Sequence, residues 1–410
     1  MKISLSLLVL LMILHPGVFA QGGTDTTEVV QFPDGVPQKD LPDVLKEIFR
    51  RSPVKKEINP TPAMVENKAY ISVFPAIGYT LQTRLAAVLA GNVAFYVQDT
   101  KNTNLSTVTS SIAYTQNKQI TIPLQSNIWS KNNKFNFQGD WRFYKYPQDT
   151  YGLGSDNSLK TDQDPMDYSY IRFYSVLLRN IGHHFYAGGG YYLDYHWNIE
   201  ETGYPAGRVS DYQLYGPKGK TTSSGYVLNL LYDSRTSSVN SMGGAYANVV
   251  YRDNTTWLGS NSNWTSLLLD LRKYFRFPAS SNNVLGFWNY DWMVLGGKPP
   301  YLDLPSTSWD TYTNTGRGYI QGRFRSYNML YLETEYRFQL TRNGLLGGVV
   351  FANTQAFSDW PSGKINQLQP AVGTGLRVKL NKSSRTNLDI DYGFGINGSQ
   401  GLFVNIGEVF

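Results

Sequence analysis

The chain has 410 residues and no cysteine, and only 17% of its residues are charged although 14% are aromatic. The absence of cysteine excludes disulfides, thiolate metal sites, cysteine nucleophiles and a lipid-modified N-terminal cysteine. The formal charge of +6 is small for this length and is not gathered in one block, which argues against a nucleic-acid partner.

The first twenty residues have the pattern of a secretory signal. Lys2 precedes an apolar run, 3–14, and Val18 and Ala20 occupy the small-residue positions before a cleavage site. The apolar run is too short to span a bilayer. We therefore expect residues 1–20 to be a cleaved signal peptide, with a mature chain that begins at Gln21.

Residues 21–66 are rich in proline and contain one helical pattern. Asp40 suits the N-cap, Pro42 suits the first turn, and apolar residues recur from Leu41 with the spacing of an amphipathic helix. We expect a short periplasmic segment over 21–66 with a helix at 41–51. A single short helix buries no core of its own, so we expect it to pack against another surface, such as the mouth or lumen of a barrel. It is also a candidate docking element for a partner protein.

From residue 67 to 410 the apolar period is two. In 330–338, for example, Leu330, Leu332 and Tyr336 alternate with Glu333 and Glu335. Strands about ten residues long, apolar on one face and charged on the other, are typical of transmembrane β-barrels. A soluble sandwich is the alternative, but its strands would be nearer 5–6 residues long. The pattern therefore predicts an all-β, antiparallel outer-membrane barrel over 67–410, exported in a Gram-negative bacterium.

Sixteen strands are expected, an even number as in single-chain bacterial barrels. Their spans are 68–80, 84–98, 105–116, 118–129, 134–146, 166–179, 183–198, 221–235, 245–257, 262–275, 283–296, 326–338, 344–356, 370–380, 385–396 and 401–410. Tight turns at 80–84, 116–118, 179–183 and 380–385 are expected at one end of the barrel. Long loops at 147–165, 199–220 and 297–325 are expected at the other.

Tyrosine and tryptophan cluster near the expected strand ends, as an interfacial girdle does. The cluster contains Trp129, Trp141, Tyr144, Tyr146, Tyr191, Tyr192, Trp197, Trp257, Trp264 and Trp288. The last expected strand places Leu402, Val404, Ile406 and Phe410 on one lipid-facing side, together with the charged Glu408. A terminal aromatic residue such as Phe410 resembles the signal that the outer-membrane assembly machinery reads.

The longest loop, 297–325, carries Gly316-Arg317-Gly318-Tyr319. It is followed by Tyr331 to Phe338, by Phe351-Ala352-Asn353, by Gly373 to Leu380 and by Arg385 to Gly395. In this order the segments resemble the barrel of the BamA/TamA-type bacterial surface-antigen superfamily, most strongly over 315–410. The resemblance implies a sixteen-stranded barrel whose sixth extracellular loop folds its Arg-Gly-aromatic motif into the lumen.

An arginine that enters a lumen needs anionic partners, because an unpaired buried guanidinium is costly. The alternation points Glu333, Glu335, Asp389 and Asp391 inward, with Arg377 and Lys379 among them. The resemblance implies an aspartate partner where this chain has Asn353, so the sequence leaves Asn353, Glu333, Glu335 and Asp391 as candidate partners of Arg317. A polar lumen lined by unrelated charges is the alternative interpretation.

The resemblance is to the reduced branch of the superfamily that lacks N-terminal periplasmic POTRA modules, since 21–66 is too short for one such module. His196 shares a strand face with Asp194 and is a candidate base, but no Gly-x-Ser-x-Gly motif accompanies it. The acidic loop 147–165 matches no calcium-binding loop. We therefore expect no enzymatic activity, no cofactor and no metal.

Three functional hypotheses remain at this stage. The first is outer-membrane protein or lipid assembly, or translocation, through a weak seam between the first and last strands. The second is a passive channel with a plug, and the third is a structural barrel that docks a partner protein. The expected partners are outer-membrane lipids, the assembly machinery during insertion, and proteins that bind the N-terminal helix.

Overall fold

The computed structural model describes residues 36–49, 69–80, 82–98, 103–205, 207–216, 219–382 and 385–410. The expected signal peptide and most of the segment 21–66 lie outside these residues. No helix in these ranges is long and apolar enough to cross a membrane.

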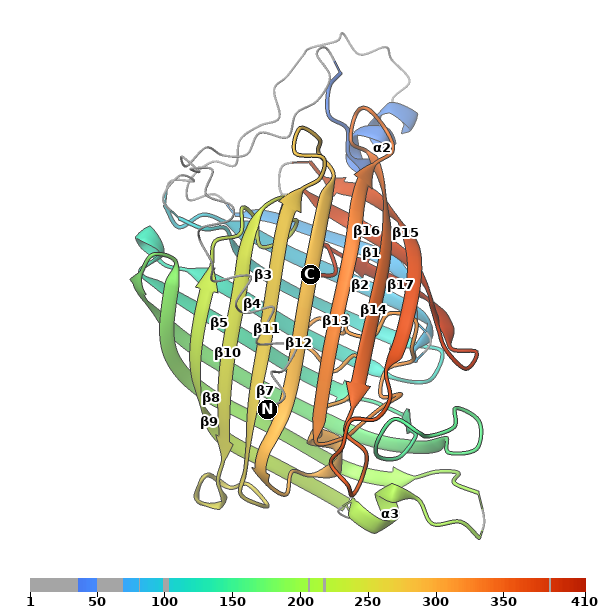
Figure 1. Ribbon diagram of the computed structural model, residues 1–410. Helices are drawn as coiled ribbons and strands as arrows, with labels where there is room; N and C mark the ends of the chain where they lie inside the picture. The colour runs from blue at the N-terminus through green and yellow to red at the C-terminus, as the bar shows by residue number, and fades with distance from the viewer. Residues whose placement is uncertain are drawn as a thin grey trace.

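The described chain forms a single sheet of 17 strands (Figure 1). The strands are β1 (Tyr70–Thr80), β2 (Arg84–Phe95), β3 (Ser106–Thr115), β4 (Ile120–Trp129), β5 (Phe135–Lys145), β6 (Gln148–Thr150), β7 (Asp164–Gly182), β8 (Phe185–Glu201), β9 (Gly219–Asp233), β10 (Gly244–Asn254), β11 (Trp264–Arg276), β12 (Val284–Gly297), β13 (Asn328–Gln339), β14 (Leu346–Phe357), β15 (Gln369–Asn381), β16 (Thr386–Gly395) and β17 (Gln400–Ile406). The helices are α2 (Leu41–Phe49), α3 (Asp211–Tyr215) and the 3₁₀ turns η1 (Lys131–Asn133), η2 (Thr256–Leu258) and η3 (Tyr301–Asp303).

Every ladder is antiparallel and joins strands that are neighbours along the chain. The short strand β6 continues β5 after a break at 146–147, and both pair with β7. With β5 and β6 counted as one interrupted strand, the wall of the barrel has sixteen strands. Each of the sixteen predicted spans falls on one of these strands. The prediction of an all-β antiparallel barrel fold is confirmed.

The sheet curls into a barrel whose strands tilt across its long axis (Figure 1). Within it, β1 and β17 approach each other with Cα atoms 8 Å or less apart. The described residues of these two strands form no hydrogen-bonded ladder, whereas β1 pairs with β2 along its whole length. The barrel therefore has a seam at β1 and β17.

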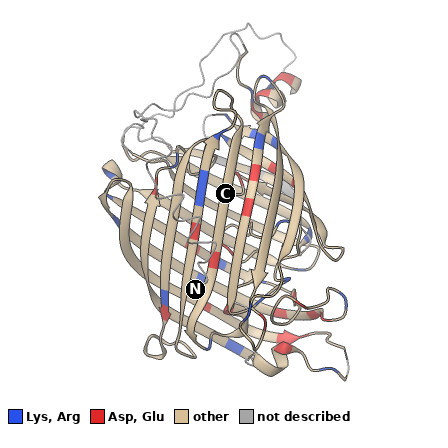
Figure 2. Ribbon diagram, viewed as in Figure 1, with Lys and Arg blue, Asp and Glu red and all other residues tan. Residues whose placement is uncertain are grey.

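The two faces of the strands differ as the alternation predicts. Along β13, Met329, Tyr331, Glu333, Glu335 and Arg337 are buried in the interior, and the residues between them are partly exposed. In Figure 2 most positions of each strand are uncharged residues, and the charged residues form short runs.

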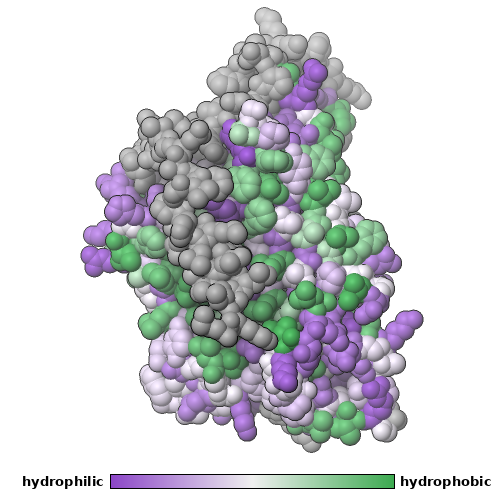
Figure 3. Space-filling model, in the orientation of Figure 1, coloured by the Kyte–Doolittle hydropathy of each residue, from purple (hydrophilic) through white to green (hydrophobic). Residues whose placement is uncertain are grey.

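The outer surface is apolar. Figure 3 shows apolar side chains spread over the strands on the visible face, and polar side chains gathered over the loops near α3. The exposed apolar residues of the strands include Ile71, Leu89, Ile112, Phe173, Leu177, Leu228, Phe287, Val350 and Val372. An apolar outside around a charged inside is the arrangement that a transmembrane barrel requires.

The predicted aromatic girdle is wrong in part. Trp129, Tyr146, Trp264 and Trp288 are buried at 4% exposure or less, on the interior side of the wall. The sequence pattern placed them near strand ends but did not show which face each one occupies. These aromatic rings pack the lumen instead of the lipid interface.

The described residues of the long connections, 146–163, 202–205, 207–216 and 298–327, all lie at the end of the barrel that carries α3, as predicted. The tight turns do not all lie at the other end. In an antiparallel meander successive connections alternate between ends, so the turns that follow β1 and β3 share the end of the long loops. The prediction that all the tight turns gather at the opposite end is therefore wrong.

Helix α2 covers most of the predicted span 41–51, and residues 50 and 51 lie outside the described residues. Asp40 accepts a hydrogen bond from the Asp43 amide at 3.1 Å, which is the predicted N-cap. The helix sits on the rim of the barrel, where Lys382 Nζ lies 2.7 Å from Asp43 Oδ2 and the Lys39 amide donates to the Asn343 carbonyl at 3.1 Å. Its contacts with the barrel are therefore largely polar.

Candidate functional site in the barrel lumen

The connection 298–327 between β12 and β13 folds into the barrel. Residues 299–310, 314–319 and 321–326 are all buried, although no regular strand or long helix holds them together. A loop buried over this length must find hydrogen-bond partners on the surrounding wall. Those partners define the candidate site.

Arg317 lies at the centre of the loop's contacts and is 2% exposed. Its Nη1 lies 2.5 Å from Asp391 Oδ2, its Nη2 lies 2.6 Å from Glu335 Oε2, and Nη2 also pairs with Glu333. The structure thus brings together Arg317 and three of its candidate partners. Charge-assisted bonds of a guanidinium to several carboxylates are among the strong hydrogen bonds of proteins.

Asn353 was a candidate partner of the Arg317 guanidinium, but in the structure it binds the main chain of Arg317 instead. Its Nδ2 donates to the main-chain oxygen of Arg317 at 2.9 Å, so the amide holds the loop backbone and does not accept from the guanidinium. The guanidinium carbon lies 3.8 Å from the centre of the Phe351 ring, on the same strand β14. Phe351 therefore provides a cation–π surface that the charge pattern did not reveal.

The glycines of the motif allow the loop to approach the wall closely. Gly318 has a φ of +108°, and a Cβ there would lie 2.8 Å from the Ala371 side chain. On the wall, a Cβ at Gly393 would lie 2.7 Å from the Gly318 nitrogen. Tyr319 then donates from its hydroxyl to the Pro370 carbonyl at 2.6 Å. All four motif residues, Gly316 to Tyr319, are consequently packed against β14–β16.

The same loop also reaches the opposite wall. Arg142 Nη2 and Gln125 Nε2 donate to the Thr311 carbonyl at 2.7 and 2.6 Å. Ser223 Oγ donates to Asp303 Oδ2 at 2.5 Å. The loop therefore spans the lumen from β13–β16 to β4, β5 and β9.

Residues 407–410 correct the prediction for the end of the chain. The ladder of β17 ends at Ile406, and Gly407, with a φ of +95°, turns the following residues into the lumen. Glu408 therefore does not face lipid. Its carboxylate lies 2.9 Å from Arg377 Nε and accepts from Asn387 Nδ2 at 2.5 Å.

Phe410 is buried against Trp288 and Tyr274, with ring centres 5.3 and 6.0 Å apart, and so does not share an outward face with Leu402. The role of Phe410 as an assembly signal remains a prediction. The loop and this segment meet inside the barrel, where Asn314 Nδ2 donates to the Val409 carbonyl at 2.7 Å.

The remaining predicted partners do not contact Arg317 directly. Arg377 Nη1 lies 2.5 Å from Asp391 Oδ1, and Arg377 Nε lies 3.1 Å from Asp389 Oδ1. Arg337 pairs with the same Glu335 that binds Arg317. Arg317, Arg337 and Arg377 thus belong to one buried network of alternating charges with Glu333, Glu335, Asp389, Asp391 and Glu408.

His196 has no arrangement for nucleophilic catalysis among the described residues. Its Nδ1 lies 3.5 Å from Asp303 Oδ1 and 3.4 Å from Thr221 Oγ1. Ser223, the nearby hydroxyl, donates to Asp303 and not to the imidazole. These contacts hold the loop to β8 and β9.

The acidic loop residues Asp156 and Asp162 contact Gln367 and Arg208. Among the residues that the structure describes, no group of three or more histidine, aspartate or glutamate side chains is placed to hold a metal ion.

Comparison with solved structures bears on this arrangement. BamA from Haemophilus ducreyi, in a form lacking POTRA domains 1–3, is similar with a TM-score of 0.54 and 12% identity over 83% of this chain and 70% of that one. This chain has the fold of the BamA barrel. At this identity the similarity establishes the fold alone.

Two further barrels are similar at lower scores. CdiB from Acinetobacter baumannii has a TM-score of 0.49 and 10% identity over 83% of this chain, and the match spans 60% of the CdiB chain. A porin mutant from Rh. blastica has a TM-score of 0.32 and 9% identity over 83% of this chain and 99% of that one. No family model and no curated protein sequence matches the chain.

Proposed function

We propose that this protein is an integral outer-membrane barrel that takes part in the assembly or translocation of outer-membrane proteins or lipids. The chain would act through its seam, where β1 and β17 separate to offer a lateral opening. The apolar exterior, the charged interior and the BamA barrel fold support a place in the outer membrane.

The observation that carries the proposal is the contrast between the seam and the rest of the wall. Elsewhere in the wall neighbouring strands are joined by ladders, with eleven residue pairs between β1 and β2 and between β13 and β14, seven between β16 and β17, and six between β3 and β4. Between β1 and β17 the described residues form no ladder. Strand edges with unpaired peptide groups are templates for pairing with another strand.

The buried loop supports the same proposal. A lumen crossed by residues 299–326 and entered by 407–410 offers little space for an aqueous solute to pass along the axis. A lateral route does not require that space.

Depletion of the protein in the source organism tests the proposal. We expect a census of the outer membrane to show loss of particular proteins or a changed lipid composition before growth stops. An unchanged membrane composition, together with a defect in uptake of a small solute, would contradict the assembly role and favour a channel. Complementation with the wild-type gene is the control for secondary effects of depletion.

A further inference from the structure

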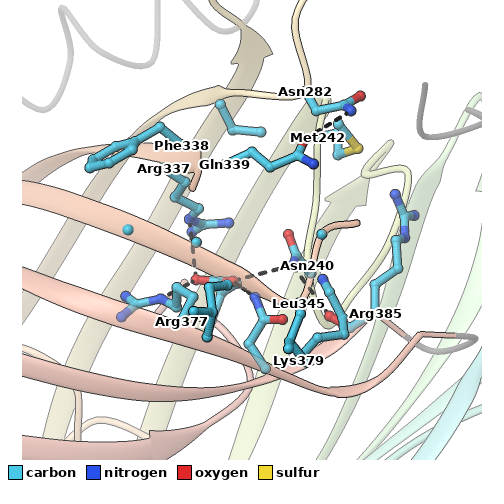
Figure 4. Close-up of a pocket in the computed structure, with 17 residues that line it drawn as sticks. Asn240, Met242, Asn282, Arg337, Phe338, Gln339, Leu345, Arg377, Lys379 and Arg385 are labelled. Carbon is cyan, nitrogen blue, oxygen red and sulfur yellow. Dashed lines mark hydrogen bonds and ion pairs between the residues drawn. The ribbon is translucent and has the colours of Figure 1, made fainter. Parts of the chain in front are cut away.

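The interior also contains a cavity whose lining does not include Arg317. This cavity of about 110 Å³ opens at the end of the barrel that carries α2 (Figure 4). It is bordered by the turns 234–243 and 340–345 and by the nearby ends of β13, β15 and β16. One buried water needs roughly 10–15 Å³ by the same measure, so the cavity has room for a polyatomic solute.

The lining of this cavity is strongly basic. Arg337, Arg377, Lys379 and Arg385 line it together with a single carboxylate, Glu408.

The carboxylate is already occupied. Its oxygens meet Arg377 Nε at 2.9 Å, Arg337 Nε at 3.5 Å, Asn387 Nδ2 at 2.5 Å and Asn240 Nδ2 at 3.2 Å. Glu335, Asp389 and Asp391 contact the two arginines from outside the cavity lining. These carboxylates pair with Arg337 and Arg377, whereas Lys379 has no ion pair in the described part of the chain.

Two donors of the lining have no acceptor in the described part of the chain. The Lys379 side chain makes no hydrogen bond or ion pair there. Arg337 is 6% exposed, and its Nη1 is buried without a hydrogen-bond partner. Buried polar groups in native structures are almost always paired, and an unpaired one is costly. This penalty applies to Arg337 Nη1, whereas Lys379 is partly buried and is a second charged donor at the same cavity. A ligand with several acceptor oxygens would pair with both.

We propose that this cavity is a binding site for a small oxyanion of the phosphate type. Lys379 supplies a compact charge, Arg337 supplies its Nη1 donor, and Arg385 adds positive charge at the border. Guanidinium and ammonium groups are the usual partners of phosphate in proteins. The site does not depend on the proposed role in assembly, because it rests on the cavity and its donors alone.

A stability titration of the full-length protein in detergent tests the site. Inorganic phosphate, compared with chloride at equal ionic strength, should raise the melting temperature in a saturable manner. Lys379→Gln should weaken the apparent affinity by about tenfold or more, since it removes a charged hydrogen bond. The matched control Lys273→Gln changes a β11 lysine that does not line the cavity, and it should bind phosphate as the wild type does. A phosphate response of equal affinity in the two variants would overturn the proposal.

The phosphate could belong to a free solute or to a lipid headgroup, and a second arm separates the two. Detergent micelles that contain phosphatidic acid are compared with micelles that contain phosphatidylcholine. A response to inorganic phosphate identifies a free solute, and a Lys379-dependent response to phosphatidic acid alone identifies a headgroup. The absence of a Lys379-dependent response in both arms would overturn the site. Arg385→Gln repeats the test if Lys379→Gln fails to fold.

Discussion

At the scale of single residues, Arg317 shows how one side chain fixes a long loop. Its guanidinium meets carboxylates from β13 and β16 while its main-chain oxygen accepts from β14, so three strands hold the same residue. Removing one partner of a buried ion pair leaves the others uncompensated, which typically costs about 3–5 kcal/mol.

Arg317→Ala should therefore destabilise the folded barrel by about that amount, because Glu333, Glu335 and Asp391 lose their common cation. The stability of Arg317→Lys should lie between that of the wild type and that of Arg317→Ala. Lysine keeps the positive charge, but its ammonium cannot reproduce the forked hydrogen bonds of the guanidinium. Loss of heat-resistant migration in detergent measures the effect. Arg179→Ala, at an exposed arginine of β7, is the control, and a melting profile for Arg317→Ala that matches this control would contradict the role of Arg317.

Asn353→Asp gives a second prediction at this scale. The substitution restores the residue type that the superfamily resemblance implies, yet here it should destabilise the protein by about 1–3 kcal/mol. Its carboxylate cannot donate to the Arg317 carbonyl, and it adds a charge beside carboxylates that Arg317 already neutralises. Asn198→Asp, at an exposed asparagine, controls for the added charge. A more stable Asn353→Asp protein would show that the guanidinium prefers an aspartate at this position.

These residues also show what could be predicted from the sequence. Inward placement of Glu333, Glu335 and Asp391 followed from the period of two, since strand side chains alternate between faces. The interior position of Glu408 did not follow, because Gly407 ends the strand by a change in backbone direction that the alternation does not report. Phe351 and Arg142 were missed as loop contacts for a related reason: their partners are distant in sequence and come together only when the barrel closes.

At the scale of elements, the strands were predictable and the connections less so. Strand spans follow from apolar alternation, which is a local signal. The course of 298–327 depends on partners on two opposite walls, and no local signal encodes them. Helix α2 was predictable in part. Its N-cap and apolar period are local signals in the sequence, whereas its contact with the turn at 382 depends on residues distant in the sequence.

The contact of α2 with the barrel should depend on pH. Burial raises the pKa of Asp43, but hydrogen bonds from Lys382 and the Asp40 amide outweigh this effect and leave the pKa below its ordinary value of 3.8. An acid with a lowered pKa in the docked state stabilises docking above its ordinary pKa, and this contribution is lost as pH falls through the lowered value. Docking should therefore be intact at neutral pH and weaken below about pH 4.

Hydrogen exchange of residues 41–49, corrected for the intrinsic rate at each pH, measures this effect. Asp43→Asn should show at neutral pH the faster exchange that the wild type shows in acid. Equal protection of the helix in both proteins at neutral pH would contradict the role of the Lys382–Asp43 pair.

At the scale of the whole molecule, the interior is occupied from both ends. The loop enters from the end with α3, residues 407–410 enter from the end with α2, and Asn314 joins them through the Val409 carbonyl. Both insertions are held by the network of buried arginines and carboxylates. The barrel is therefore a wall around a packed interior, with its weakest join at the seam between β1 and β17.

The packed interior predicts low conductance. In planar bilayers the wild-type protein should show little current, and a variant in which residues 299–326 are replaced by a short linker should show large steady openings. Heat-modifiable migration of the variant shows that its barrel has formed. Large steady currents from the wild type would contradict the plugged lumen and favour a passive channel.

The central claim is that the seam between β1 and β17 opens during function, and a covalent lock tests it most directly. The chain has no cysteine, so a cysteine at Val73 paired in turn with one at Leu402, Val404 or Ile406 introduces a single possible disulfide. Each single-cysteine variant is the control, and a reductant should reverse the effect. We predict that one of these pairs cross-links and that the oxidised protein fails to restore outer-membrane composition in depleted cells, whereas the reduced protein restores it. Full restoration by the fully cross-linked protein would contradict the claim.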